Sequence, residues 1–483
     1  MNLWLTTFLL KPAPVKKIVL VLSLLLSFQS KSQKIQPVYP IPTKEQLAWH
    51  EKEFYLFIHF GPNTFTDKEW GEGDERPDIF NPTQLDCRQW ARIAKQAGAK
   101  GIILTAKHHD GFSLWPSKYS THTVRESKWM NGKGNVVKAL SEACKKEGIE
   151  MGVYLSPWDR NHPKYGTPEY NDVYIATMKE LIQQYGPFFE FWWDGANGEG
   201  PNGKKQVYDF KRFEKAVFKL QPNMIIFSDI GPSIRWCGNE KGFIGNTNWN
   251  LLDTAGFARG LGAPHVDTLN QGNVNGKHWI PAEADVSIRP GWFYHKEEDD
   301  KVKTAETLFN IYLRSVGNGG NLLLNVPPDR RGLFHPNDSA ALMGFARMKA
   351  EAFRTDLFAN AVITTNDKQQ TGLSNLTDKN IRSFWAAQSG KEVQLTFTVG
   401  NEQTFNAVSL EEMIDYGQRV ISFSIEYWNN GRFEKIFSGT TIGRKKIASF
   451  NTIKTNRIRI TIHETKASVV LRAVSAYYIK SMP

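Results

Sequence analysis

The most constraining feature of this chain is an alternation of short apolar runs with amphipathic stretches, which extends from residue 54 to about residue 355. Such alternation is typical of βα units arranged around a parallel sheet. We expect one helix over Thr83–Ala97, between Pro82 and Gly98, and another over Lys303–Val316. The predicted strands are Phe54–His59, Gly101–Lys107, Glu150–Ser156, Phe188–Trp193, Met224–Asp229, His278–Asp285 and Asn321–Val326.

This count of strands favours an α/β fold of the (β/α)₈ barrel type, whose eighth strand gives no clear signal. A doubly wound sheet that binds a nucleotide is not favoured, because no GxGxxG or GxxxxGK[ST] motif follows any of these strands. The sequence therefore predicts a catalytic barrel over residues 34–358.

After residue 360 the apolar residues alternate with a period of two. Ile421, Phe423, Ile425 and Tyr427 alternate with other residues, the turn-forming Asn429-Asn430-Gly431 follows, and Ile458, Ile460 and Ile462 alternate again. This pattern is typical of a β-sandwich. We predict a separate all-β domain over residues 359–483, which is either a packing module or a carbohydrate-binding module.

The N-terminus has the pattern of a secretory signal. Lys16 and Lys17 precede the apolar run Ile18–Phe28, which is too short to span a bilayer with ease and leads into the polar stretch Gln29–Gln33. We predict a signal segment over residues 1–33, export to the periplasm or the extracellular space, and a mature chain without a transmembrane domain. An uncleaved N-terminal anchor is the alternative.

Charge and cysteine content exclude further classes. The formal net charge is +11, but residues 1–33 contribute four lysines and no acid, and the remaining basic residues form no stripe or arm. A nucleic-acid partner is therefore not expected. The three cysteines are an odd number, so at least one is free, and Cys87 and Cys144 fall on the apolar faces of predicted helices as small core residues.

Polar and aromatic residues stand at the ends of the first four predicted strands. They are His59, the sequence His108-His109-Asp110, Tyr154, and Trp192-Trp193-Asp194. In a barrel the active site forms at the C-terminal ends of the strands. Aromatic rings offer apolar platforms for a sugar, while His and carboxylate groups bind its hydroxyls. This combination predicts sugar hydrolysis.

Glycosidases need two carboxyl groups at the scissile bond. Asp194 is the candidate nucleophile, because it ends an apolar strand and Gly195 lets the backbone turn away, although an Asp here could instead cap the next helix. The candidate acid is Glu240 or Glu283. The residues themselves leave both open, and we favour Glu240, which follows a predicted strand in a Gly- and Asn-containing loop.

A metal site was weighed against these roles. His59, His108, His109 and Asp110 are metal-ligand types, but adjacent strand residues point to opposite faces, and no HxH or HExxH spacing occurs. We therefore expect neither a catalytic metal nor another cofactor.

At these residues the sequence resembles the α-L-fucosidases of glycoside hydrolase family 29. The segments that carry the resemblance are Phe57-Ile58-His59-Phe60-Gly61, Glu69-Trp70, Ala106-Lys107-His108-His109-Asp110-Gly111-Phe112, Trp192-Trp193-Asp194-Gly195 and Gly317-Asn318-Gly319-Gly320-Asn321-Leu322-Leu323-Leu324-Asn325-Val326. The family's architecture, a catalytic barrel followed by a β-sandwich, agrees with the change of pattern near residue 360.

The resemblance implies that Asp194 is the nucleophile of a retaining, double-displacement mechanism. The stretches Arg235–Glu240 and Ser287–Tyr294 look like the branch that cleaves α-1,3- and α-1,4-linked fucose, which supports Glu240 as the acid/base. We thus expect an exo-α-L-fucosidase that acts on Lewis-type oligosaccharides or glycoconjugates. The substrate-binding residues that we expect are His59, Glu69, Trp70, His108, His109, Tyr154, Trp192, Arg235 and Trp292.

The same residues are consistent with two other functions. One is a secreted carbohydrate-binding protein that has kept the pocket and lost turnover. The other is a glycosidase of the same fold that acts on a different α-glycoside, such as a galactoside. An apolar contact for the C6 methyl group of fucose would distinguish fucose from galactose.

Overall fold

The computed structural model describes residues 35–389 and 392–480. The predicted signal segment, residues 1–33, lies outside the described residues. The described residues from Pro37 onward form one compact unit. None of the helices in the described ranges is both long and apolar enough to cross a membrane.

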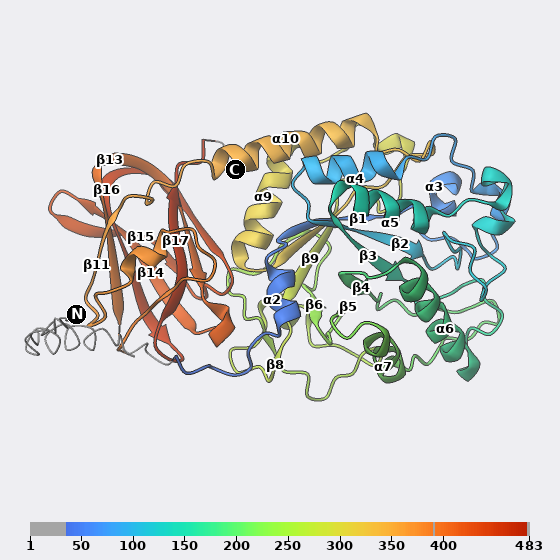
Figure 1. Ribbon diagram of the computed structural model, residues 1–483, viewed down its shortest axis with the longest axis horizontal. Helices are drawn as coiled ribbons and strands as arrows, with labels where there is room; N and C mark the ends of the chain where they lie inside the picture. The colour runs from blue at the N-terminus through green and yellow to red at the C-terminus, as the bar shows by residue number, and fades with distance from the viewer. Residues whose placement is uncertain (1–34, 390–391, 481–483) are drawn as a thin grey trace, which may run out of the picture. The chain divides into compact units, whose positions relative to one another are not determined.

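Eight parallel strands close into a barrel in the order β1-β10-β9-β6-β5-β4-β3-β2 (Figure 1). This arrangement, followed by an all-β C-terminal domain, confirms the predicted fold class. The barrel strands are β1 Phe54–Ile58, β2 Gly101–Lys107, β3 Glu150–Leu155, β4 Glu190–Trp192, β5 Ile225–Ser228, β6 Ile234–Trp236, β9 Ala282–Ser287 and β10 Asn321–Asn325.

Helices cover the outside of the barrel. Helix α4 begins at Cys87 rather than at the predicted Thr83, because the carboxylate of Asp86 accepts the amides of Arg88 and Gln89 and caps the helix there. The helices are α2 Lys44–His50, α3 Pro62–Thr66, α4 Cys87–Gln96, α5 Val136–Glu147, α6 Pro168–Tyr185, α7 Phe210–Leu220, α8 Val266–Gln271, α9 Ala305–Ser315 and α10 Pro336–Ala352.

The eighth strand is β6, which lies in a stretch that the sequence pattern assigned to a loop. It is only three residues long and follows β5 after five residues, 229–233, with no helix between them. The predicted strand His278–Asp285 is in fact two strands. Its first part is β8, His278–Trp279, which pairs with β7, Leu251–Leu252, outside the barrel, and only the part from Ala282 belongs to β9.

The barrel interior is filled by alternate residues of the strands. Tyr55 and Phe57 of β1, Tyr154 of β3 and Trp192 of β4 pack with Phe227 of β5 in one apolar cluster. All are at most 7% exposed. The barrel interior is therefore a packed core, and in such barrels the active site forms at the C-terminal ends of the strands.

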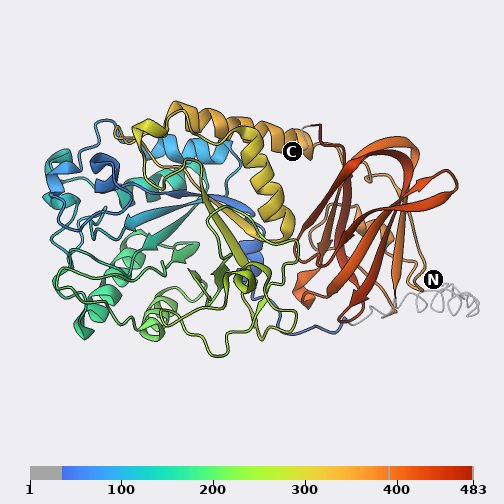
Figure 2. The ribbon, with the colours of Figure 1, turned by 180° about the vertical axis from the view of Figure 1, so that it is seen from behind.

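The C-terminal domain is antiparallel and encloses its own apolar core (Figure 2). The predicted turn is present: Asn430 and Gly431, with φ of 46° and 87°, connect β14 to β15. The predicted domain boundary after residue 358 falls between α10 and β11. The strands are β11 Val362–Thr365, β12 Trp385–Ala386, β13 Val393–Glu412, β14 Val420–Asn429, β15 Arg432–Gly439, β16 Lys446–Thr465 and β17 Val470–Tyr477.

Cys87, Cys144 and Cys237 are all buried and unpaired. Cys87 and Cys144 lie in the main apolar core, as their positions on the helices predict.

Candidate active site

A cavity of about 160 Å³ lies at the C-terminal ends of the barrel strands. Nearly all of the residues that the sequence predicted for the site meet there, although they come from segments far apart in the chain. This volume is below the range of about 300–1,000 Å³ that is typical of ligand pockets, and it suits a single small ring. The lining residues are Phe57, His59, Glu69, Trp70, His108, His109, Tyr154, Trp192, Asp194, Ala196, Glu240, Asp285 and Trp292.

Asp194 is held in place by two hydrogen-bond donors. The Tyr154 hydroxyl donates to Oδ2 at 3.0 Å, and the amide of Ala196 donates to Oδ1 at 2.8 Å. The nearest histidine nitrogen, Nε2 of His109, is 3.7 Å from Oδ2. The side chain remains 25% exposed. It is an oriented carboxylate that faces the cavity, and the backbone amide that it accepts in the described part of the chain, Ala196, belongs to no helix.

Glu240 lies on the same cavity in a different environment. Burial raises the pKa of its carboxyl above the usual value of 4.5, and the nearby charge of Asp194 adds to this shift. The indole Nε1 of Trp292 donates to Oε2 at 3.3 Å, which opposes the shift. The cavity therefore combines Asp194, a carboxylate that two donors orient, with Glu240, a carboxyl whose pKa is raised.

Three histidines line the cavity as neutral imidazoles. Burial lowers the pKa of His59 and of His109 to about 4 and lowers the pKa of His108 well below its usual value. His59 Nδ1 is 2.8 Å from Asn325 Oδ1, and His109 Nδ1 is 2.8 Å from the Ser156 hydroxyl. These contacts fix the rings and leave their other nitrogens available to sugar hydroxyls.

Aromatic rings form much of the wall. Trp192 stacks on Phe227 with ring centroids 4.0 Å apart, and the Trp292 ring lies 5.2 Å from the His59 ring. Trp70 is 55% exposed at the mouth and meets His109 edge to face. Apolar ring faces and polar nitrogens are thus interleaved around one small space.

Glu69 fixes the segment that carries Trp292. Its carboxylate accepts the amides of Trp292 and Phe293 at 2.8 Å and 3.1 Å, and it lies 2.6 Å from His295 Nε2. Glu69 thereby connects the Glu69-Trp70 segment to the far side of the cavity, where Trp292 contacts Glu240.

Glu283, the alternative acid, does not line the cavity. It is fully buried inside the barrel, where Oε1 accepts from Trp192 Nε1 at 2.9 Å and Oε2 accepts from the Tyr55 hydroxyl. Glu190 lies beside it and accepts from Trp49 and Tyr55 at 3.1 Å. Glu283 thus supports Trp192 from below, and of the two candidates only Glu240 reaches the cavity.

Arg235 was expected in the sugar pocket, and the structure corrects this prediction. Its guanidinium is completely buried and donates to the carbonyls of Leu269, Ile280 and Trp249. Because Arg235 belongs to strand β6 and not to a loop, its side chain points away from the barrel interior. It binds the segments outside the barrel to β6.

Three further residues of the wall were missed by the sequence analysis: Phe57, Ala196 and Asp285. Phe57 lies two residues before His59, and Asp285 two residues after Glu283, so the period of two in strands could have indicated both. Asp285 accepts from Trp236 Nε1 at 2.9 Å, and burial raises its pKa well above the usual value. Ala196 has no polar or aromatic side chain, so nothing in the sequence marked it as a site residue.

No group of three or more His, Cys, Asp or Glu residues within the described ranges is arranged as a metal site. The interaction partners of the two carboxyl groups are hydroxyl, indole and amide donors. The arrangement as a whole is that of a cavity the size of one sugar whose lining includes four acidic residues, Glu69, Asp194, Glu240 and Asp285, with neutral imidazoles and aromatic rings around it.

Comparisons with known proteins agree with this arrangement. Residues 49–349 match the family model "Alpha-L-fucosidase", and residues 360–474 match "F5/8 type C domain". "Alpha-L-fucosidase 1" of Arabidopsis thaliana is 40% identical, and the match covers 92% of this chain and 88% of that protein.

Solved structures show the same similarity. The crystal structure of SpGH29 is 39% identical with a TM-score of 0.88, and the match covers 92% of this chain and all of that one. A Ruminococcus gnavus GH29 fucosidase in complex with fucose is 30% identical with a TM-score of 0.85, covering 93% of this chain and 97% of that one. The chain therefore belongs to the alpha-L-fucosidase family, glycoside hydrolase family 29, and is a glycoside hydrolase.

Proposed function

We propose that the protein is a retaining exo-α-L-fucosidase that works by double displacement, with Asp194 as nucleophile and Glu240 as acid/base. The observation that carries this proposal is that Asp194 and Glu240 line one cavity of about 160 Å³, while Glu283 does not. A cavity of this size holds a terminal sugar and excludes an internal one, which supports exo action.

The proposed reaction has two steps. In the first, an Asp194 oxygen bonds to the anomeric carbon while the glycosidic bond breaks, and Glu240 gives its proton to the leaving oxygen. In the second, Glu240 takes a proton from water, the water oxygen bonds to the anomeric carbon, and Asp194 is released. The donors on Asp194 and the raised pKa of Glu240 support this division of roles.

Fucose binding would use both the polar imidazoles and the apolar rings of the cavity wall. The neutral imidazoles of His59, His108 and His109 can donate to or accept from its hydroxyls. The rings of Trp192 and Trp292 offer apolar surface to a sugar face and to the C6 methyl group. This supports a fucoside over a galactoside, whose C6 hydroxyl would need a hydrogen-bond partner in the same place.

The proposed substrates are Lewis-type glycans with α-1,3- or α-1,4-linked fucose. The support is the likeness of Arg235–Glu240 and Ser287–Tyr294 to that branch of the family, together with the place of Glu240 and Trp292 on the cavity. Arg235 itself no longer contributes to the argument, because its side chain is not at the site.

A substrate panel tests the proposal. The protein should hydrolyse a chromogenic α-L-fucoside and leave the matching galactoside intact, and it should release fucose from Lewis-type trisaccharides far faster than from an α-1,2-fucosylated glycan. NMR should show α-L-fucose as the first product. A first product of β configuration would refute retention, and binding without turnover would identify a carbohydrate-binding protein instead.

We also propose that residues 1–33 direct export to the periplasm or the extracellular space, where fucosylated glycans are accessible. The support is the Lys16-Lys17 pair followed by the apolar run Ile18–Phe28. N-terminal sequencing of the protein from the native cell should find a mature chain that begins close to residue 33. A chain that begins at Met1 would contradict cleavage.

A further inference from the structure

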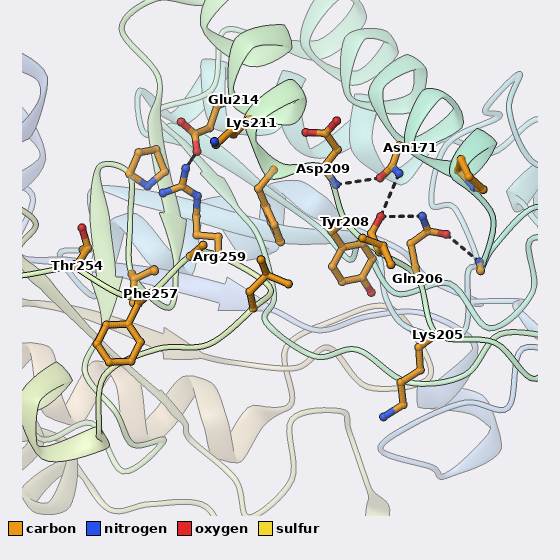
Figure 3. Close-up of a pocket in the computed structure, with 18 of the residues that line it drawn as sticks. Asn171, Lys205, Gln206, Tyr208, Asp209, Lys211, Glu214, Thr254, Phe257 and Arg259 are labelled. Atoms are coloured by element: carbon orange, nitrogen blue, oxygen red, sulfur yellow. Dashed lines mark hydrogen bonds and ion pairs between the residues drawn. The ribbon is translucent and has the colours of Figure 1, made fainter.

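A second, larger cavity of about 770 Å³ has Tyr208, Phe257 and Arg259 among its lining residues (Figure 3). It is bounded by the N-terminal ends of α6 and α7, by the loop residues 205–209, and by the segment 254–262. Because five residues without a helix connect β5 to β6, this flank of the barrel lacks the helix that would otherwise cover it.

The segment that follows Asp194 forms a wall between this cavity and the active site. Ala196 lines the active-site cavity, and the hydroxyl of Tyr208, a residue of the larger cavity, lies 3.4 Å from the Ala196 carbonyl. On the other side, Asp229 packs against Gly195, where a Cβ atom would lie 2.4 Å from Asp229 Oδ2, and the next residue, Ile230, lines the larger cavity. Gly195, which belongs to this wall, has no side chain and is exposed.

Loop residues 205–209, which form one wall of the larger cavity, are held in place by hydrogen bonds within the protein. The Asn171 side chain donates to the Val207 carbonyl at 3.0 Å and accepts the Asp209 amide at 3.1 Å. Gln206 accepts the Gly166 amide at 2.8 Å and also donates to the Val207 carbonyl. Figure 3 shows these contacts side by side. A preformed wall lowers the entropic cost of binding.

Exposed apolar side chains converge on the mouth of this cavity. Val207 is 77% exposed, Phe257 is 42% exposed and Leu261 is 83% exposed. Phe257 and Leu261 belong to a segment whose Arg259 forms an ion pair with Glu214 of α7, as Figure 3 shows. Apolar groups gathered at one concave site indicate a binding function.

The lining favours a neutral, hydroxyl-rich ligand. Its charged side chains nearly balance, because Lys205, Lys211 and Arg259 face Asp209 and Glu214. The Lys205 and Lys211 ammonium groups and the Thr254 hydroxyl can bond to hydroxyl groups, while the Phe257 ring offers a flat apolar face. This is the chemistry that binds hexoses and N-acetylhexosamines.

We propose that this cavity is a distal subsite for the neutral sugars of the same glycan whose fucose occupies the active site. The inference rests on the proposed function, because a cavity of about 160 Å³ leaves every sugar beyond fucose outside the active site. The glycan passes over the wall at Gly195. The subsite then binds the part of the substrate that lies farthest from the scissile bond, and it favours long glycans over short ones.

A substrate series tests the subsite with the Phe257→Ala variant. We compare an aryl fucoside, a Lewis-type trisaccharide and a Lewis-type pentasaccharide with the same fucose linkage. In the variant KM for the pentasaccharide should rise roughly tenfold, which corresponds to the loss of one good apolar contact, while kcat/KM for the aryl fucoside stays within about twofold. Leu261→Ser, at an even more exposed position, should act in the same direction.

Tyr119→Ala is the matched control, because Tyr119 is also 42% exposed and lines neither cavity. It should leave all three substrates unchanged. If Phe257→Ala affects the three substrates equally, or affects none of them, the subsite does not exist. An altered oligomeric state of Phe257→Ala with unchanged glycan kinetics would assign the surface to a protein contact and likewise overturn the proposal.

Calorimetry separates this inference from the proposed function. The tetrasaccharide left after the pentasaccharide loses its fucose should bind the wild-type protein, and the Phe257→Ala variant should bind it roughly tenfold more weakly. This result is independent of turnover, so it tests the subsite even if the aryl fucoside is not hydrolysed. Equal binding to both proteins would overturn the subsite and leave the proposed function intact.

Discussion

Asp194 and Glu240 share one cavity, but their surroundings differ. Asp194 is oriented by two donors, the Tyr154 hydroxyl and the backbone amide of Ala196. Glu240 has a single indole donor and is disfavoured as an anion by burial and by Asp194. Two carboxyl groups with separated roles are what a retaining glycosidase requires.

At the residue scale, Glu240→Ala should affect substrates according to their leaving groups. The aryloxide of an activated aryl fucoside leaves without protonation, so kcat for such a substrate should fall only modestly. For natural glycans kcat should fall on the order of 10²–10⁴-fold, the usual contribution of a general acid. Steady-state rates on both substrates measure this. An equal loss on both would show that another group protonates the leaving oxygen, and Asp285, which also lines the cavity, would be the next candidate.

At the scale of the elements, strands β4 and β9 contribute Glu190 and Glu283 to one buried pair below Trp192. Burial raises the pKa of Glu190 well above 4.5 and that of Glu283 to about 7. The folded state therefore binds more protons than the unfolded state from pH 4.5 up to about 7, and stability falls as the pH rises through this window.

Glu283→Gln should therefore weaken the fall in stability between pH 5 and pH 8. The amide cannot ionise, and its oxygen can still accept from Trp192 Nε1, so the variant should gain stability relative to wild type as the pH rises. Urea unfolding at both pH values measures this difference. Glu297→Gln, at an exposed position, is the control. An unchanged pH dependence in Glu283→Gln would show that the pair does not titrate in this range.

Arg235 stabilises β6 from outside the barrel. Arg235→Met should leave three buried carbonyls without their donor and lower the free energy of unfolding by about 1–3 kcal/mol for each that stays unsatisfied. KM for an aryl fucoside should not change. A raised KM with an unchanged free energy of unfolding would contradict this account and show that Arg235 binds the sugar.

The elements that the sequence predicted best are those with strong periodicity. Long apolar strands such as Gly101–Lys107 were located correctly from their periodicity. The residues at their C-terminal ends were located correctly as well, because the C-terminal ends of all barrel strands lie on the same face. Strand β6 was missed since three residues give no period and no helix precedes it. That error placed Arg235 in a loop and then in the pocket.

Glu283 illustrates a different limit of sequence analysis. Its inward direction follows from strand alternation, but depth along the barrel axis depends on register. Glu283 pairs with Asn321 at the start of β10, whereas Asp285 pairs with Leu323 two residues farther up. Only the register between β9 and β10 shows that Glu283 lies below the cavity and that Asp285 lines it.

At the scale of the whole molecule, an ion-pair network with buried arginines and a partly exposed Glu51 connects the barrel to the C-terminal domain. Arg444 is 2.8 Å from Glu51 and 3.3 Å from Glu411, and Arg472 is 2.7 Å from Glu51. The neighbouring cations Lys445 and Arg444 lower the pKa of Glu53 to about 2 despite its burial. This contribution to stability is present above about pH 4.5 and is lost as the pH falls toward 2.

Arg444→Met should lower the free energy of unfolding by about 1.5–3 kcal/mol, the contribution of hydrogen bonds to charged groups. The variant loses the buried guanidinium that faces Glu51 and Glu411, but Arg472 still pairs with both carboxylates. Arg432→Met, which removes an exposed pair with Glu434, should cost about 0–1 kcal/mol. Because the network joins both domains, calorimetry of the wild type should show one transition. Two separate transitions, or equal effects of the two variants, would contradict this account.

The most direct test of the account is the fate of the Asp194→Gly variant in the presence of azide. Removal of the carboxylate should abolish nearly all turnover of an aryl fucoside while the circular dichroism spectrum and Tm stay close to those of the wild type. Azide should occupy the vacated space, attack the anomeric carbon and restore release of the aryl group. NMR should then identify β-L-fucosyl azide, whereas full turnover without azide, or an azide product of α configuration, would show that Asp194 is not the nucleophile.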